Sequence, residues 1–212
     1  MNINRRHALQ QLGALALFAS PSIRALGQEP GTFTVLKNPV SVEAGGKIEV
    51  LEFFHYACNH CRDFDPALSK WLEKLPDDVA FSRVPAPWNP ALEELGRLYY
   101  ALQAVKRLDL HEKIFAAVQE ERLPLNRPET VREWVGRHKL DVPAFMDAYQ
   151  SFGVQTQVQR TKQLYQSYRV DAVPTMAVGG RFLTSMSLAK GRENTLRVVD
   201  QLIDKVRRKQ VP

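Results

Sequence analysis

The feature that most constrains this chain is a pair of cysteines, Cys58 and Cys61, placed between two segments of different periodicity. The segment of residues 48–54 before the pair is short and almost continuously apolar, and it is rich in β-branched and aromatic residues. This pattern is typical of a strand buried on both faces. The residues after the pair place apolar side chains at helical spacing. These side chains are Phe64, Leu68, Leu72 and Leu75, and Pro76 follows them. The sequence therefore predicts a strand that leads directly into a helix, with the cysteines at the junction.

These two cysteines are the only ones in the 212 residues, and their spacing argues for chemistry rather than stability. A disulfide between Cys58 and Cys61 closes so short a loop that it restricts the unfolded chain very little. The alternative is half of a zinc site, but a structural zinc site needs four Cys or His ligands and the chain has no second cysteine pair. The pair thus favours thiol–disulfide exchange, with no metal ion and no organic cofactor.

The predicted strand-to-helix junction gives the two cysteines different properties. The first turn of a helix presents unpaired N–H groups and the positive end of the helix dipole, which stabilise a thiolate at Cys58. His60 can add positive charge or a hydrogen bond, although an exposed histidine without a role is the alternative interpretation. Cys61 lies one turn deeper and is expected to keep a higher pKa, as the thiol that resolves a mixed disulfide.

The remaining strand patterns lie at both ends of the chain. Residues 32–36 predict a short edge strand, and Val79 with Phe81 predict a second inner strand that prolines end. Residues 174–178 and 181–184 predict two strands joined by a two-residue hairpin turn at Gly179-Gly180. A final amphipathic helix is predicted from its apolar face. This face consists of Leu196, Val199, Leu202, Ile203 and Val206.

Residues 88–170 show only helical patterns, in stripes that prolines separate. Four stripes are expected to face a core: Leu92, Leu95, Tyr99 and Leu102; Leu110, Ile114 and Val118; Val131, Trp134 and Val135; and Phe145, Tyr149 and Phe152. The predicted fold class is therefore α/β with an inserted all-helical domain at residues 88–170. The α/β domain is then formed by residues 28–87 and 171–212.

Residues 1–27 have the composition of a secretory signal peptide. They carry three arginines and no acid, an apolar run at residues 12–19 that is too short to span a bilayer, and the small-residue pair Ala25 and Gly27. Arg5-Arg6 also resembles a twin-arginine export signal, so the export route stays open. Cleavage would leave 26 basic and 23 acidic residues, a net charge of +3. This mild charge, without a basic run that includes aromatic residues, argues against nucleic-acid binding.

Several motifs together resemble the DsbA family of periplasmic thiol:disulfide interchange proteins. They are Leu51-Glu-Phe-Phe54 followed by the cysteine motif, the helical insertion, and Val173-Pro174-Thr175. The resemblance covers essentially residues 30–210 and implies a thioredoxin-like fold whose two halves flank the inserted helices. DsbA is known for a strongly acidified cysteine and a strongly oxidising disulfide, so the resemblance raises the same expectation here.

The resemblance also implies roles for individual residues. Cys58 would be the nucleophile and Cys61 its buried partner, together forming the redox-active disulfide. Pro174 would be a cis-proline facing that disulfide, since X–Pro bonds are the ones that adopt the cis form at low cost. An ordinary trans-proline that opens a strand is the alternative.

The residues that flank Pro174 and the acid in the preceding strand have implied roles as well. Val173 and Thr175 would contact a substrate peptide, which could pair with the backbone there like an added strand. Glu52 matches the acid beneath the disulfide in this family, where a buried carboxyl has a raised pKa and could pass protons to Cys61. A solvent-facing position for Glu52 is the alternative, because a strand register can slip by one residue.

The resemblance implies a function as well. The disulfide would be donated to reduced, unfolded proteins newly exported to the periplasm, and a quinone-linked membrane oxidase of the DsbB type would reoxidise the pair. A monomer is expected. The best-known motif of the family has proline where this chain has Asn59, so the resemblance does not supply the reduction potential.

Three other functions are compatible with parts of this sequence. A reductase or disulfide isomerase could use the same fold, but isomerases of this kind dimerise through an added N-terminal domain, which residues 28–45 are too few to form. A kappa-type glutathione transferase has similar inserted helices but lacks the cysteine pair. A zinc-binding or chaperone module is the non-enzymatic alternative, which metal analysis of the purified protein would test.

Overall fold

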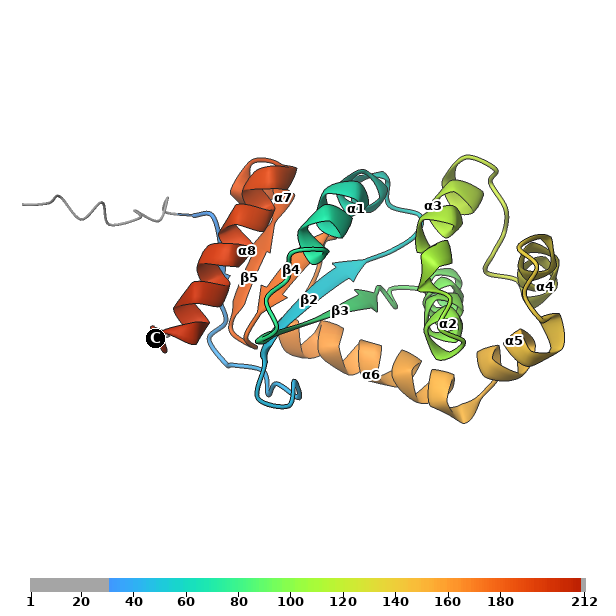
Figure 1. Ribbon diagram of the computed structural model, residues 1–212, viewed down its shortest axis with the longest axis horizontal. Coiled ribbons are helices and arrows are strands. Elements are labelled where there is room, and N and C mark those ends of the chain that lie inside the picture. The colour runs from blue at the N-terminus through green and yellow to red at the C-terminus, as the bar shows by residue number, and fades with distance from the viewer. Residues whose placement is uncertain (1–30, 211–212) are drawn as a thin grey trace, which may run out of the picture.

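The computed structural model describes residues 31–210, so the expected signal peptide at residues 1–27 lies outside the described part. Its elements follow the predicted order of strands, one helix, a helical insertion, and a second group of strands with a final helix (Figure 1). They are β1 (Thr34–Val35), β2 (Ile48–Phe54), α1 (Asn59–Leu72), β3 (Val79–Pro85), α2 (Pro90–Ala104), a 3-10 turn (Leu108–Leu110), α3 (His111–Gln119), α4 (Pro128–Arg137), α5 (Val142–Tyr149), α6 (Phe152–Tyr168), β4 (Thr175–Val178), β5 (Phe182–Ser185), α7 (Met186–Ala189) and α8 (Arg192–Arg207).

The five strands form one mixed sheet in the order β1-β5-β4-β2-β3. Strand β2 lies inside the sheet, between β4 and β3. It pairs in parallel with β3, where Ile48 is opposite Val79, and antiparallel with β4, where Glu52 is opposite Met176. The prediction of a second inner strand is wrong for β3, which lies at the edge of the sheet. An edge strand tolerates Pro85 at its end because no further strand needs the missing N–H.

Alternation along β2 assigns its side chains to two different layers. Val50 packs with α1 and α8 on one face, whereas Leu51 and Phe53 pack against α6 on the other. By the same alternation Glu52 lies on the Val50 face, the face that α1 covers. Figure 1 shows α1 and α8 on one side of the sheet and α6 passing along the other.

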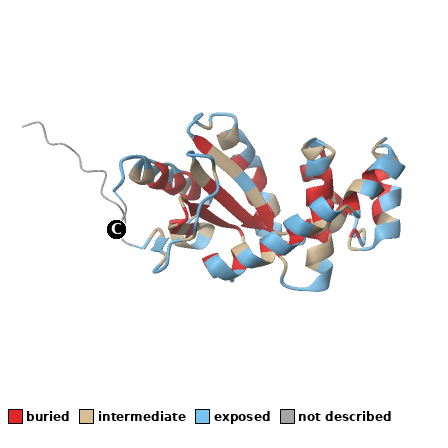
Figure 2. Cartoon of the chain, turned by 90° about the horizontal axis from the view of Figure 1, so that it is seen from below, coloured by how far each residue is buried: buried red, intermediate tan, exposed pale blue. Residues whose placement is uncertain are grey.

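The helical insertion lies between β3 and β4, as predicted, and builds a core that also takes in Phe54, Tyr56 and Cys61 from the cysteine region. This core contains buried side chains of α2, α3, α4 and α5, and the first half of α6 adds Val154 and Val158. The second half of α6 places Tyr165 and Tyr168 against the sheet, so this one helix joins both cores. Figure 2 shows the buried residues in red gathered in the sheet and between the inserted helices. The limits at residues 88 and 170 stay a prediction.

Helix α1 differs from expectation at its end. It stops at Leu72 and does not include Leu75, because the residue before Pro76 is kept out of the helical region by the proline ring. Pro66 lies inside the helix, where it cannot donate a backbone hydrogen bond.

Two expectations in the later part of the chain are wrong. Phe152 does not continue the stripe of Phe145 and Tyr149 but is 86% exposed, because Ser151 caps a new helix by accepting the N–H of Val154 at 3.2 Å. The β4–β5 turn has three residues rather than two, since Val178 pairs directly with Phe182.

Among residues 31–210, no helix combines the length and the apolar character needed to cross a bilayer.

Candidate active site

The turn between β2 and α1 places Cys58 at the N-cap of the helix. The backbone N–H of Cys58 donates to the carbonyl of His55 at 3.0 Å, which closes the turn. The extended backbone of Cys58 (φ −96°, ψ 116°) then leads into α1, and its carbonyl accepts the N–H of Arg62 at 3.1 Å. The predicted strand-to-helix junction is therefore present, and the sulfur of Cys58 faces the unpaired N–H groups of the first turn.

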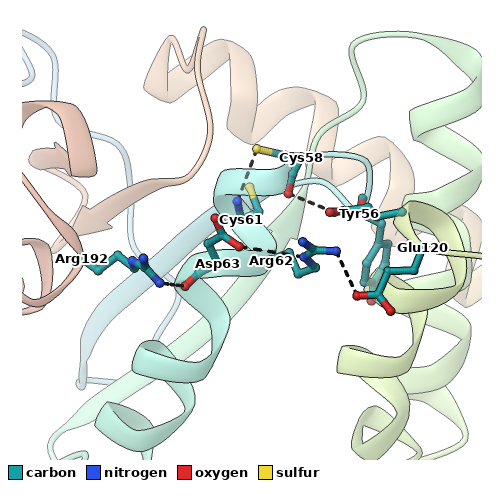
Figure 3. A network of polar contacts seen from close by, with 8 residues as sticks. Tyr56, Cys58, Cys61, Arg62, Asp63, Glu120 and Arg192 are labelled. Atoms are coloured by element: carbon teal, nitrogen blue, oxygen red, sulfur yellow. Dashed lines mark hydrogen bonds and ion pairs between the residues drawn. The ribbon is translucent and has the colours of Figure 1, made fainter.

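Cys58 is half-buried, and its surroundings favour the thiolate. Its Sγ accepts the backbone N–H of Cys61 at 3.4 Å, as Figure 3 shows. A hydrogen bond from the Cys61 thiol, together with backbone N–H groups of Cys61 and His60 and the charge of His60, lowers the pKa of Cys58 to about 6. Partial burial opposes this shift but is outweighed. At neutral pH, Cys58 is therefore mostly ionised and reactive.

Cys61 has the opposite character. It has no exposed surface, and burial raises the pKa of its thiol far above the ordinary value, with Cys58 and the charge of Glu52 acting in the same direction. Both cysteines are free thiols in this structure. The two sulfurs of one short motif thus differ in exposure and acidity, which is the division between an attacking and a resolving thiol.

The acidity of Cys58 can be measured directly. We expect the ultraviolet thiolate absorbance of the reduced protein to appear with a midpoint near pH 6. Cys61→Ala should raise this midpoint, because it removes the thiol that donates to the Cys58 sulfur. Cys58→Ser is the control and should show no thiolate signal around neutral pH, since the pKa of Cys61 is far higher. A wild-type midpoint near that of an ordinary cysteine would contradict the assignment.

The loop before β4 lies beside the redox pair, because β4 pairs with β2. The Val173–Pro174 peptide bond is cis, and the carbonyl of Val173 lies 3.7 Å from Cys58 Sγ, close enough to accept the thiol proton. Thr175 is buried, and its hydroxyl donates to the carbonyl of Ala172 at 2.8 Å. The structure therefore brings Val173 next to the reactive sulfur, while substrate binding at Val173 and Thr175 stays a prediction.

Glu52 is 2% exposed, so the alternative of a solvent-facing position is wrong. Its Oε2 accepts from Nε of Arg83 at 2.9 Å, and Nη2 of the same arginine donates to Oδ1 of Asp65 at 2.7 Å. Burial raises the pKa of Glu52 to about 7, although Arg83 opposes the shift. One guanidinium thus serves two buried carboxyl groups.

This buried cluster extends to the helical insertion. His111, the first residue of α3, places Nε2 3.5 Å from Oδ1 of Asp65 and Nδ1 2.7 Å from the hydroxyl of Tyr56. Sequence reasoning missed Arg83, Asp65, His111 and Tyr56. One signal was available: Asp65 follows Cys61 by four residues, so both lie on the same face of the helix.

Other side chains of the insertion hold the active-site turn. Nε2 of Gln119, at the end of α3, donates to the carbonyls of Tyr56 at 2.7 Å and of Cys58 at 3.1 Å. The next residue, Glu120, accepts from Arg62 of α1 at 3.2 Å, and Figure 3 shows this exposed ion pair beside the cysteine turn. The insertion therefore positions the turn that carries Cys58, which sequence periodicity did not indicate.

A groove of about 1040 Å³ lies away from the cysteine turn. It runs between α6 and the segment of residues 35–44, over Glu49 and Leu51 of β2, and neither cysteine lines it. In residues 31–210, no three His, Cys, Asp or Glu side chains are grouped so as to hold a metal ion.

A thioredoxin-like sheet, a helical insertion and an acidic cysteine at a helix N-cap define a thiol–disulfide oxidoreductase. Comparison with known proteins agrees. Residues 49–192 match the DSBA-like thioredoxin domain, so the chain belongs to the DsbA family. It is 41% identical over 197 residues to the thiol:disulfide interchange protein DsbA of Bordetella pertussis, covering 92% of this chain and 93% of that protein.

Solved structures of the family share the fold. The crystal structure of Pseudomonas aeruginosa DsbA superposes with a TM-score of 0.82 at 35% identity, covering 85% of this chain and 94% of that one. The oxidoreductase NmDsbA1 from Neisseria meningitidis gives a TM-score of 0.77 at 32% identity, covering 86% of this chain and 95% of that one. The predicted fold class and family are confirmed.

Proposed function

We propose that this protein donates its Cys58–Cys61 disulfide to reduced, newly exported proteins during oxidative folding in the periplasm. The observation that carries the proposal is the contrast between an acidic, half-exposed Cys58 and a buried Cys61. A low pKa makes Cys58 a good leaving group and stabilises the reduced enzyme, so a disulfide built on it is a donating one. The signal peptide expected at residues 1–27 would direct export to this compartment.

The reaction is a pair of thiol–disulfide exchanges. A substrate thiolate attacks Cys58, the Cys58–Cys61 bond breaks, and Cys61 leaves as a thiolate that must take up a proton. The thiolate of the second substrate cysteine then attacks the sulfur of the first substrate cysteine, which is still bonded to Cys58. This forms the substrate disulfide and releases Cys58 as a thiolate. The substrate loses two electrons and two protons, and the enzyme is reduced to the dithiol. A quinone-linked membrane oxidase of the DsbB type would accept these electrons and restore the disulfide.

The other site residues have roles in this cycle. His60, exposed in the first turn of α1, stabilises the Cys58 thiolate by its charge. Glu52 supplies a proton to the leaving Cys61 and takes it back during reoxidation, which its pKa of about 7 suits. Val173 and Thr175 flank Pro174 and bind the substrate backbone. Trp88, which is 43% exposed and packs against His55, offers an apolar surface next to the turn.

The direction of catalysis is tested by the redox equilibrium with glutathione, measured by trapping the free thiols of Cys58 and Cys61. The protein should begin at Gln28, so that the signal peptide is absent. We expect glutathione to reduce the pair readily, even in a fairly oxidising mixture, and the oxidised protein to oxidise a reduced two-cysteine peptide stoichiometrically. If the pair stays oxidised until a much stronger reductant is added, Asn59 has shifted the centre and a reductase is the better assignment.

A further inference from the structure

The cluster beneath the redox pair has two carboxyl groups and one cation. Within residues 31–210, Glu52 accepts only from Arg83, at 2.9 Å, whereas Asp65 faces both Arg83 at 2.7 Å and His111 at 3.5 Å. All four side chains are buried or nearly so, the most exposed being Arg83 at 12%. Two ionised carboxylates would leave this site with an uncompensated buried charge, which is costly, so the two groups compete to hold one proton.

His111 has the geometry to decide this competition. Its Nδ1 lies 2.7 Å from the Tyr56 hydroxyl, and its Nε2 makes no hydrogen bond to any described residue and has Asp65 as its ion-pair partner. A ring lone pair aimed at a carboxylate would be repelled, so the proton of the neutral ring belongs on Nε2 while Tyr56 donates to Nδ1. At 3.5 Å the Nε2–H···Oδ1 contact is long for a hydrogen bond and acts electrostatically, with little screening in this buried site.

We propose that His111 is a positioning residue for this proton: it stabilises the ionised form of Asp65 and thereby leaves the proton on Glu52. The helical insertion thus keeps a neutral carboxyl group ready beneath Cys61. The inference deepens the proposed function, because a protonated Glu52 is the form that can supply the leaving Cys61 with a proton.

Every charged or titratable group that faces the cluster is consistent with this assignment. They come from several elements: Cys61 from α1, Tyr56 from the turn, Tyr99 from α2 and Tyr165 from α6. Burial raises the pKa of each tyrosine, so all three stay neutral and add no competing charge. Burial and the charge of Arg83 lower the pKa of His111, against the effect of Asp65, so the ring is neutral too. The His111 contact and Arg83 outweigh burial and hold the pKa of Asp65 below its ordinary value.

The test is a carboxyl-carbon NMR titration of the oxidised protein, with Glu52→Gln and Asp65→Asn assigning the two signals. In His111→Phe, which keeps a ring among Phe54, Tyr56, Tyr99 and Phe115, we expect the Asp65 midpoint to rise and the Glu52 midpoint to fall. Each should move by about one pH unit, the tenfold change typical of one buried contact. His111→Gln supplies a donor and an acceptor again and should restore values near wild type.

The control is His138→Phe, the same substitution in the same insertion, at a ring that contacts Trp134 instead of the cluster. It should leave both carboxyl midpoints unchanged. Unchanged midpoints in His111→Phe, or a parallel rise of both, would overturn the proposal. If His111→Phe does not fold, ring-nitrogen NMR of the wild-type protein decides: a neutral ring with its proton on Nε2 supports the proposal, whereas a proton on Nδ1 or a charged ring overturns it.

These titrations need no substrate and no turnover. The proposal can therefore fail while the protein still oxidises peptides, and it can hold even if the glutathione equilibrium indicates a reductase.

Discussion

Replacing Cys58 by alanine is expected to reduce the oxidation of a two-cysteine peptide by about 10⁴-fold or more, the scale of losing a covalent nucleophile. Cys58 is the half-exposed thiol with the lowered pKa, and Cys61 is fully buried, so a substrate thiolate has no other sulfur to reach. The change should cost little stability, because Cys58 is only partly buried and its backbone hydrogen bonds remain. Turnover is followed by the loss of free thiols in the peptide.

Cys61→Ala is the matched variant for this prediction. It also removes turnover, but for a different reason, because a variant with Cys58 alone has no disulfide to donate, although its thiolate can still attack a disulfide. The two variants are therefore incubated with a disulfide-linked dimer of a one-cysteine peptide, where attack by Cys58 releases one peptide thiol and leaves the other peptide bound to Cys58. Non-reducing electrophoresis should show this mixed disulfide with Cys61→Ala and none with Cys58→Ala. If Cys58→Ala retained substantial turnover, or if the mixed disulfides formed with Cys58→Ala instead, the assignment of attacking and resolving thiols would be wrong.

The redox centre was predictable because its signals are local. A buried strand, two cysteines and an apolar helical stripe stand next to one another in the sequence, and backbone periodicity alone brings Cys58 to a helix N-cap. The buried position of Glu52 was expected from the resemblance to the DsbA family, because the strand pattern alone left a solvent-facing register open. The cysteine junction itself depends only on residues close to it in the sequence.

What could not be predicted depends on contacts between distant segments. Arg83 reaches Glu52 across 31 positions, and Gln119 reaches the carbonyl of Cys58 across 61. In the sequence, Arg83 is a single cation near the end of a predicted inner strand, and Gln119 is the polar end of a helical stripe. The sequence around these two residues does not indicate how the insertion packs against the sheet. The partners of Arg83 and Gln119 can therefore be identified only in the folded chain.

The misplaced residues have a related cause. Phe152 fits a helical stripe with Phe145 and Tyr149, yet a serine cap starts a new helix axis at that point and turns the ring outward. The edge position of β3 likewise depends on strand order, which periodicity along one strand cannot contain. In both cases the apolar pattern along one segment was not enough: a serine cap decides the position of Phe152, and the order of the strands decides the position of β3.

The buried cation of the cluster should have the largest effect on stability. Arg83→Met removes the partner of both Glu52 and Asp65, and breaking a buried ion pair from one side costs about 3–5 kcal/mol. The loss should be read from urea unfolding of the oxidised protein, where the disulfide removes the titration of the thiols. Arg83→Lys keeps a positive charge but cannot bridge two carboxyl groups with the same geometry, so it should cost less.

The pH dependence of that loss distinguishes charge from packing. In the folded wild-type protein the pKa of Glu52 is about 7, above the value of 4.5 for a free glutamate. The folded state therefore binds this proton more tightly than the unfolded state does. The contribution of Glu52 to the free energy of unfolding falls as pH rises from about 4.5 through about 7. Without Arg83, the pKa of Glu52 rises further and the pKa of Asp65 is no longer held as low, so the unfolding free energy should fall more steeply toward alkaline pH. The cost of Arg83→Met should therefore be clearly larger at about pH 8 than at about pH 5, where protonated carboxyl groups no longer need a cation. An equal cost at both pH values would mean that Arg83 acts through its packing, and that the carboxyl groups beneath Cys61 do not compete for its charge.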